Sequence, residues 1–212
     1  FTVKDRFPKW WVLYSVAKSL FLKFGIISFL LIFFLCSISI IMDEYVRPEA
    51  YLYAITSCLL LFGPFAINYV IAKKRKKKIL AVVEKIKETG HFKPESGSEG
   101  WLFWKSTYLG FDFQQGTFLY VRIYPGNVMD VIGFDAYSLT RTEVEDSKLR
   151  LFTRFTSLPM IPIDTGAASS IANHLHAMNN KGYTYNFNFN DVVNKKRAEI
   201  ESLTGLPVHV LA

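Results

Sequence analysis

The sequence predicts a membrane protein: a two-helix transmembrane hairpin (residues 23–72) joined to a cytoplasmic α+β domain. Two long runs without a charged residue, 24–42 and 50–72, predict the hairpin. Six consecutive basic residues directly after the second run set its orientation. Beyond residue 100, short apolar segments separated by turn residues predict an antiparallel sheet with packed C-terminal helices.

Each apolar run is long enough to cross a bilayer as a helix. The runs contain 19 and 23 residues, which corresponds to roughly 28 and 34 Å against a hydrocarbon core of about 30 Å. The first run is longer than the apolar region of a signal peptide, and no small-residue cleavage site follows it. Because the chain begins at Phe1 rather than Met, we also expect a short preceding segment.

The distribution of Lys and Arg predicts that both termini lie in the cytoplasm. The loop at 43–49 carries three acids and only Arg47, whereas basic residues flank both runs on their other sides. Positively charged flanks stay on the cytoplasmic side of a membrane. The largest cluster, here called the basic tract, consists of Lys73, Lys74, Arg75, Lys76, Lys77 and Lys78.

The net charge of +7 belongs to the membrane-proximal part of the chain. Residues 1–100 hold 15 Lys/Arg and 8 Asp/Glu, whereas residues 101–212 hold ten of each. A nucleic-acid-binding domain would carry the excess charge on itself, so no nucleic-acid partner is expected. The basic tract instead predicts contact with anionic lipid headgroups, at about 1 kcal/mol per residue.

The N-terminal segment 1–22 is predicted to lie at the membrane surface. Trp10 and Trp11 stand among lysines and precede the first apolar run, a composition typical of an interfacial helix. Recognition of a protein partner by the tryptophan pair is the alternative. Trp10, Trp11 and the basic tract are therefore the predicted membrane-contact residues.

Residues 73–90 are predicted to form a basic juxtamembrane helical stalk. Ile79, Val82, Val83 and Ile86 recur at three- and four-residue steps, which is the apolar stripe of an amphipathic helix. The domain, a second copy of the chain or the membrane surface must cover this stripe, so a homo-oligomer is left open. Residues 91–100 are polar and rich in Gly, Ser and Pro, which predicts a linker.

The domain at 101–212 is predicted to contain several strands and then helices. The segments 108–113 and 117–123 flank Gln114-Gln115-Gly116, a hairpin signal. Further strands are expected at 129–134, 149–155, 160–163 and 183–190, and helices at 167–179 and from about 190 to 204. Strands followed by a helix are, by analogy, similar to the pleckstrin-homology-like arrangement.

No catalytic, cofactor-binding or metal-binding residues are predicted, and we expect a non-enzymatic protein. The phosphate-binding, dinucleotide-binding and nucleophile-elbow motifs do not occur in the sequence. His174 and His176 are two residues apart on a helix, which does not bring them to one metal ion. Four acids near strand ends, Asp112, Asp130, Asp135 and Asp164, leave acid–base catalysis as a lesser alternative.

Three stretches between residues 119 and 181 carry a resemblance to a known family: YVRIYPGNVMDVIGFDAYSLTRTE, LRLFTRFTSLPMIPID and SSIANHLHAMNNK. They resemble the ExcA-type surface-exclusion proteins of IncI-type conjugative plasmids. The resemblance implies a bacterial inner-membrane protein that stops redundant plasmid transfer. Its implied partner is a donor-cell inner-membrane transfer protein of the TraY type, and it implies no cofactor. The alternative is a membrane-anchored adaptor or lipid-sensing module of another system.

Overall fold

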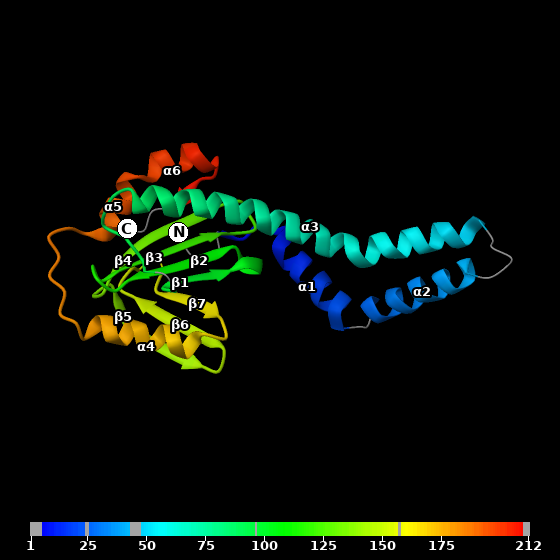
Figure 1. Cartoon of the computed structure of the whole chain (residues 1–212), viewed down its shortest axis with the longest axis horizontal. Helices are drawn as coiled ribbons and strands as arrows, with labels where there is room; N and C mark the ends of the chain where they lie inside the picture. Colours follow the sequence, from blue (N-terminus) through cyan, green and yellow to red (C-terminus); the bar gives the residue numbers. More distant parts are fainter. Residues whose placement is uncertain (1–5, 24–25, 43–47, 96, 157, 210–212) are drawn as a thin grey trace. The chain divides into compact units, whose positions relative to one another are not determined.

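A computed structural model describes residues 6–209 except 24–25, 43–47, 96 and 157 (Figure 1). The chain divides into two compact units. The helical unit comprises Pro8–Ala72, and the C-terminal unit comprises Lys73–Ala212 together with Phe1–Phe7. The greater part of the predicted loop 43–49 lies outside the described residues.

The helical unit contains α1 (Trp10–Lys23), α2 (Ile26–Ile41) and the first part of α3 (Pro48–Lys87). Aromatic rings join α2 to α3: Phe33 lies 6.0 Å from Tyr53, and Phe34 lies 6.3 Å from Phe62. Among the described residues, α3 is long and apolar enough to cross a membrane. The pair α1 and α2 meets the same criterion only if both helices, bent by 56°, count as one span.

The C-terminal unit contains a five-stranded sheet with the order β1-β2-β3-β4-β8 and a three-stranded sheet with the order β5-β6-β7. Neighbouring strands are antiparallel except β8, which pairs parallel to β4. The first sheet is formed by β1 (Glu99–Leu102), β2 (Thr107–Asp112), β3 (Thr117–Ile123), β4 (Met129–Asp135) and β8 (Val208–His209). The second is formed by β5 (Leu139–Glu145), β6 (Lys148–Thr153) and β7 (Met160–Asp164).

The prediction of an α+β domain with antiparallel sheets is confirmed. The hairpin around Gln114-Gln115-Gly116 is β2–β3, and the strand predicted at 160–163 is β7, at an edge of the three-stranded sheet. Three strands, β1, β5 and the short β8, were not predicted. Seven strands precede α4 (Ala168–Asn179), but β8 returns afterwards to the first sheet, which a pleckstrin-homology-like order does not anticipate.

Helices cover one face of the five-stranded sheet. The apolar stripe of α3, formed by Ile79, Val82, Val83 and Ile86, is buried there with residues of α5 (Phe189–Lys195) and α6 (Arg197–Thr204). Figure 1 shows the C-terminal half of α3 lying along this face beside α5 and α6. Residues 73–90 are therefore part of the folded unit, which corrects the predicted separation of a stalk from a domain at 101–212.

The predicted linker at 91–100 also differs from the structure. Phe92 is buried and stacks on Phe189, with 5.9 Å between the ring centroids. The backbone N–H of Lys93 donates to Asp112, and β1 already begins at Glu99. A segment that contributes core contacts and a strand is part of the domain, although its composition is that of a loop.

The three-stranded sheet and α4 cover the opposite face. Phe111, Phe118 and Phe134 form a stacked ladder across β2, β3 and β4, with centroid distances of 4.8 and 5.2 Å. Leu149, Leu151 and the α4 residue Leu175 complete this core. Because both faces are covered, β2 is buried along its whole length and β3 and β4 along almost all of theirs.

The prediction of a strand at 183–190 is wrong. The segment crosses from α4 to α5 without a strand ladder and is held by its side chains. The Tyr183 hydroxyl donates to the Phe113 carbonyl and the Tyr185 hydroxyl to the Gly116 carbonyl, each at 2.6 Å. Burial raises the pKa of Tyr185 to about 12. The two tyrosines of this segment anchor it through their hydroxyl groups and do not form one face of a sheet.

The predicted last helix is two helices. Asn188 caps α5, because its side-chain Oδ1 accepts from the backbone N–H groups of Asn190 and Asp191. The chain breaks at Lys196 and resumes as α6, which ends at Gly205 in the left-handed region with φ 63°. The helix end agrees with the predicted end near residue 204, and Gly205 suits the position because glycine adopts the left-handed conformation readily.

The segment before α1 is anchored in the C-terminal unit by a buried ion pair. The Arg6 Nε donates to Asp130 Oδ1 at 2.9 Å, and the two side chains are 2% and 1% exposed. Phe7 packs edge-on against Tyr124 at 5.3 Å. Burial raises the pKa of the Asp130 carboxyl, and the Arg6 guanidinium opposes that rise. The chain is thus fixed to the C-terminal unit both before residue 8 and after residue 72.

We expect Gly133→Ala to destabilise the C-terminal unit by about 2 kcal/mol, because overpacking a well-filled core has costs of this size. A Cβ at this position would lie 2.8–2.9 Å from the ring and backbone oxygen of Phe189 and from Val193. The free energy of unfolding in denaturant is the measurement. Gly166→Ala is the matched control, since nothing lies within 4 Å of its Cβ; equal stability of both variants would contradict the close contact of β4 with α5.

We expect Arg6→Gln to lower the free energy of unfolding by about 3 kcal/mol, because it leaves a buried carboxylate without its counter-charge. Adding Asp130→Asn should recover part of that loss, since a neutral amide needs no cation. Denaturant unfolding of both single variants and the double variant gives the coupling energy. Strictly additive losses would show that the two side chains act independently.

Candidate functional site

The basic tract is divided between two faces of α3. Lys73, Lys74 and Lys77 are exposed, whereas Arg75, Lys76 and Lys78 are half-buried. Lys73, Lys74 and Lys77 are one, three and four residues apart, which places them on one side of a helix. We call Lys73, Lys74 and Lys77 the exposed basic face.

The other three residues of the tract contact the C-terminal unit. Arg75 donates to Asn127 Oδ1 at 3.4 Å, and the Lys76 ammonium lies 5.3 Å from the centre of the Trp101 ring. The Lys78 ammonium donates to the Thr204 carbonyl at 2.6 Å, at the C-terminal end of α6. Half of the predicted lipid-contact tract therefore stabilises the packing of α3, and the exposed basic face carries the charge that is open to an anionic surface.

The predicted membrane-contact tryptophans lie at the start of α1. Trp10 is 56% exposed, and its ring lies 6.0 Å from Trp11 and 6.1 Å from Tyr14. This aromatic cluster has the amphipathic character of a membrane-interface anchor. Its contact with lipid stays a prediction.

The four acids near strand ends are not brought together. Asp112 accepts from the backbone N–H groups of Lys93, Gln114 and Gln115, and so closes the β2–β3 turn. Asp135 similarly holds the turn after β4, while Asp130 pairs with Arg6 and Asp164 with Lys105. Within the part of the chain that the structure describes, no group of three or more His, Cys, Asp or Glu side chains could hold a metal ion.

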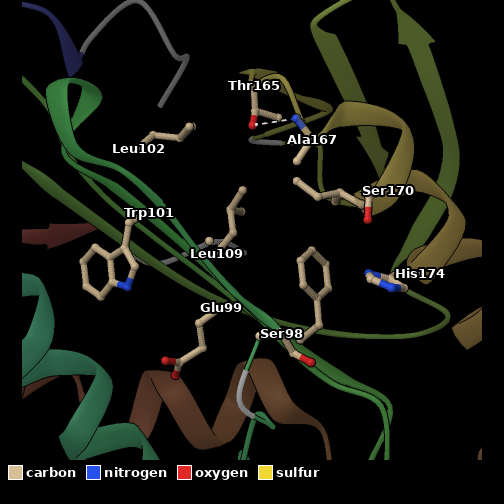
Figure 2. A pocket seen from close by; sticks show the side chains of 13 residues that line it. Ser98, Glu99, Trp101, Leu102, Leu109, Thr165, Ala167, Ser170 and His174 are labelled. Carbon is tan, nitrogen blue, oxygen red and sulfur yellow. Dashed lines mark hydrogen bonds between the residues drawn. The ribbon is translucent and has the colours of Figure 1, made fainter.

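A crevice opens between the edge strand β1 and helix α4 (Figure 2). Its volume is about 160 Å³, and Leu102, Leu109, Phe111 and Ile171 form an apolar floor. Ser98, Ser170 and His174 stand at its rim. In Figure 2 the side chains of Trp101 and Glu99 lie on the other side of β1, as the alternation of a strand requires.

The local sequence explains why the crevice exists. β1 lies at the end of the five-stranded sheet, and the hydrophobic cluster under α4 involves β2, β3 and β4 more than β1. Gly100 presents no side chain between β1 and Leu109. At the start of α4, Thr165 Oγ1 accepts from the backbone N–H of Ala167 and fixes the helix end that borders the space.

The size of the crevice limits what it can hold. Small-molecule sites usually measure about 300–1,000 Å³, so this crevice fits a side chain better than a whole ligand. It lies beside an edge strand, whose outer backbone groups can accept another extended segment. An apolar floor, a polar rim and an open strand edge together suit recognition of a polypeptide.

The crevice was missed in the sequence because its residues are far apart and individually ordinary. Residues 97–102 were predicted to be mostly linker, and Ser170 and His174 belong to a helix whose apolar stripe was the only signal. An edge strand at 99–102 has no alternating pattern longer than four residues. No sequence motif marks such a site.

One protein family accounts for almost the whole chain. The family model described as Exclusion-determining protein matches residues 3–208, a range that includes α3, the exposed basic face, both sheets and the crevice. Comparison with curated proteins and with solved structures gives no match. The prediction of an exclusion protein of conjugative plasmids is confirmed at this level, and the IncI-type, ExcA-type assignment stays a prediction. The chain belongs to the exclusion-determining protein family.

Proposed function

We propose that the chain is a non-enzymatic protein of the bacterial inner membrane that excludes redundant conjugative plasmids by recognising a donor transfer-apparatus protein of the TraY type. The match to the exclusion-determining family over residues 3–208 carries this proposal. The resemblance to ExcA-type proteins of IncI-type plasmids supports the nature of the partner. The four strand-end acids serve turns and ion pairs, which favours an interaction protein over an enzyme.

The hydropathy and charge of the chain support its location in the membrane. Helix α3 has an apolar stretch long enough to span a bilayer, and the exposed basic face follows that stretch directly. With the apolar run at 24–42 as a second span, the positive-inside rule favours both termini in the cytoplasm. The C-terminal unit is then cytoplasmic, and only the short loop at 43–49 reaches the periplasm.

The crevice beside β1 is the proposed recognition surface. Its apolar floor and open strand edge suit an extended segment of a partner protein, with one side chain in the crevice and backbone hydrogen bonds to β1. With the C-terminal unit in the cytoplasm, this surface requires that a segment of the donor protein reach the cytoplasmic side of the recipient membrane.

We expect recipients that express the full chain to take up the cognate plasmid at a lower frequency than recipients with an empty vector. The measurement is conjugation frequency, with an unrelated plasmid as the specificity control and membrane fractionation as the location control. Unchanged transfer despite a membrane-bound protein would count against exclusion. It would favour the alternative of a membrane-anchored adaptor or lipid-sensing module, to which the exposed basic face is also suited.

We expect Ser170→Trp to restore plasmid transfer toward the empty-vector level, because an indole at this position fills the crevice. Asn173→Trp is the matched control, since Asn173 is exposed on the same helix but does not line the crevice. Transfer frequency is compared at equal protein levels, and thermal unfolding checks that both variants fold. If both variants exclude as well as the unmodified chain, recognition lies elsewhere.

A further inference from the structure

At one end of the C-terminal unit, the β1–β2 turn, the end of β3 and the β3–β4 turn lie near the first residues of α3 that belong to this unit. The backbone N–H of Ile123, at the end of β3, donates to Ser106, after the β1–β2 turn, at 3.0 Å. Arg75 reaches Asn127 in the β3–β4 turn, and Lys76 reaches Trp101 at the end of β1. We call this end of the unit the turn end; it comprises residues 73–77, 103–106 and 124–128.

The turn end presents an exposed tryptophan. Trp104 is 68% exposed and lies on the short 3-10 helix Phe103–Lys105, with its ring 5.2 Å from that of Phe103. Ser106, the residue after this 3-10 helix, ends the turn with its backbone in the left-handed region, at φ 48°. Tryptophan combines a large apolar ring with a polar N–H group, which suits a position where an apolar phase meets water.

The charge around Trp104 is basic. The exposed basic face, Lys73, Lys74 and Lys77, belongs to the same end. Among the acids near this end, Asp164 is paired with Lys105 and Asp130 is buried with Arg6. Lysines beside an exposed tryptophan have the composition of the headgroup layer of an anionic bilayer.

We infer that the turn end docks on an anionic phospholipid bilayer, with the Trp104 indole in the headgroup layer and the exposed basic face on the lipid phosphates. The inference rests on the membrane location in the proposed function. Charge complementarity favours the bilayer as the partner, and so does covalent continuity. The exposed basic face follows the apolar run 50–72 within one unbroken helix, so these lysines leave a bilayer at headgroup depth.

Docking has a specific consequence for the unit. Arg75 and Lys76, next to the exposed basic face, contact the β3–β4 turn and strand β1, which leads directly into the turn that carries Trp104. A bilayer in contact with Lys73 and Lys74 would therefore also contact the turn that carries Trp104. The C-terminal unit would lie on the membrane in one orientation, instead of hanging from a flexible stalk.

The test uses full-length protein in vesicles that contain phosphatidylglycerol and brominated lipids. Trp10, Trp11 and Trp101 are changed to Phe, so that Trp104 is the only tryptophan, and the indole is excited at wavelengths that tyrosine does not absorb. We expect bromination to lower the Trp104 emission by roughly half, as for a ring in the interfacial layer. In zwitterionic vesicles, or with Lys73, Lys74 and Lys77 changed to Gln, the quenching should fall.

The control is a second single-tryptophan protein with Trp104→Phe and Tyr137→Trp. Tyr137 is 43% exposed and follows β4, at the opposite end of the same sheet. Stronger quenching of Trp104 than of the tryptophan at 137 supports docking by the turn end. Equal quenching at both sites, or none at Trp104 in protein that stays with the vesicles, overturns the inference. Protein that leaves the vesicles without detergent overturns the membrane location itself, and neither result depends on the exclusion assay.

Discussion

The packing of the α3 stripe on the five-stranded sheet is the contact on which the rest of the C-terminal unit depends. Ile79, Val82, Val83 and Ile86 are each at most 1% exposed. Full burial of such side chains stabilises a fold by about 1.5–3 kcal/mol each. Helix α3 therefore has two parts of different character. Its residues before Lys73 are apolar on all sides, and those after the basic tract are apolar on the side that packs on the sheet.

A sheet buried on both faces explains the position of the candidate surfaces. Core packing occupies the central strands β2, β3 and β4, so the candidate surfaces lie at the periphery of the unit. One such place is the crevice at the edge strand β1, and another is the turn end with Trp104. They use different faces of the same short segment: Leu102 lines the crevice, and Trp101 contacts the basic tract.

The sequence predicted those parts of the fold that have strong local signals. The β2–β3 hairpin, α4 and the helix end at Gly205 follow from turn residues and apolar spacing. The strand predicted at 183–190 failed because a period of two also suits tyrosines that reach backbone carbonyls of a neighbouring turn. β5 escaped prediction because five of its seven residues are polar. The crevice could not be predicted, because only tertiary packing brings β1 next to α4. The basic tract was evident in the sequence, but its division between two faces of α3 was not.

The ion pair between Arg6 and Asp130 also has a consequence for biosynthesis. The two residues are 124 positions apart, so the ribosome makes the arginine long before its partner. At about 5–20 residues per second, the delay is on the order of ten seconds. During that interval the apolar helices leave the ribosome while the Arg6 guanidinium is still hydrated. The ion pair between Arg6 and Asp130 forms only after β4 has been translated. The apolar segments 24–42 and 50–72 are therefore complete before the ion pair between residue 6 and β4 can form.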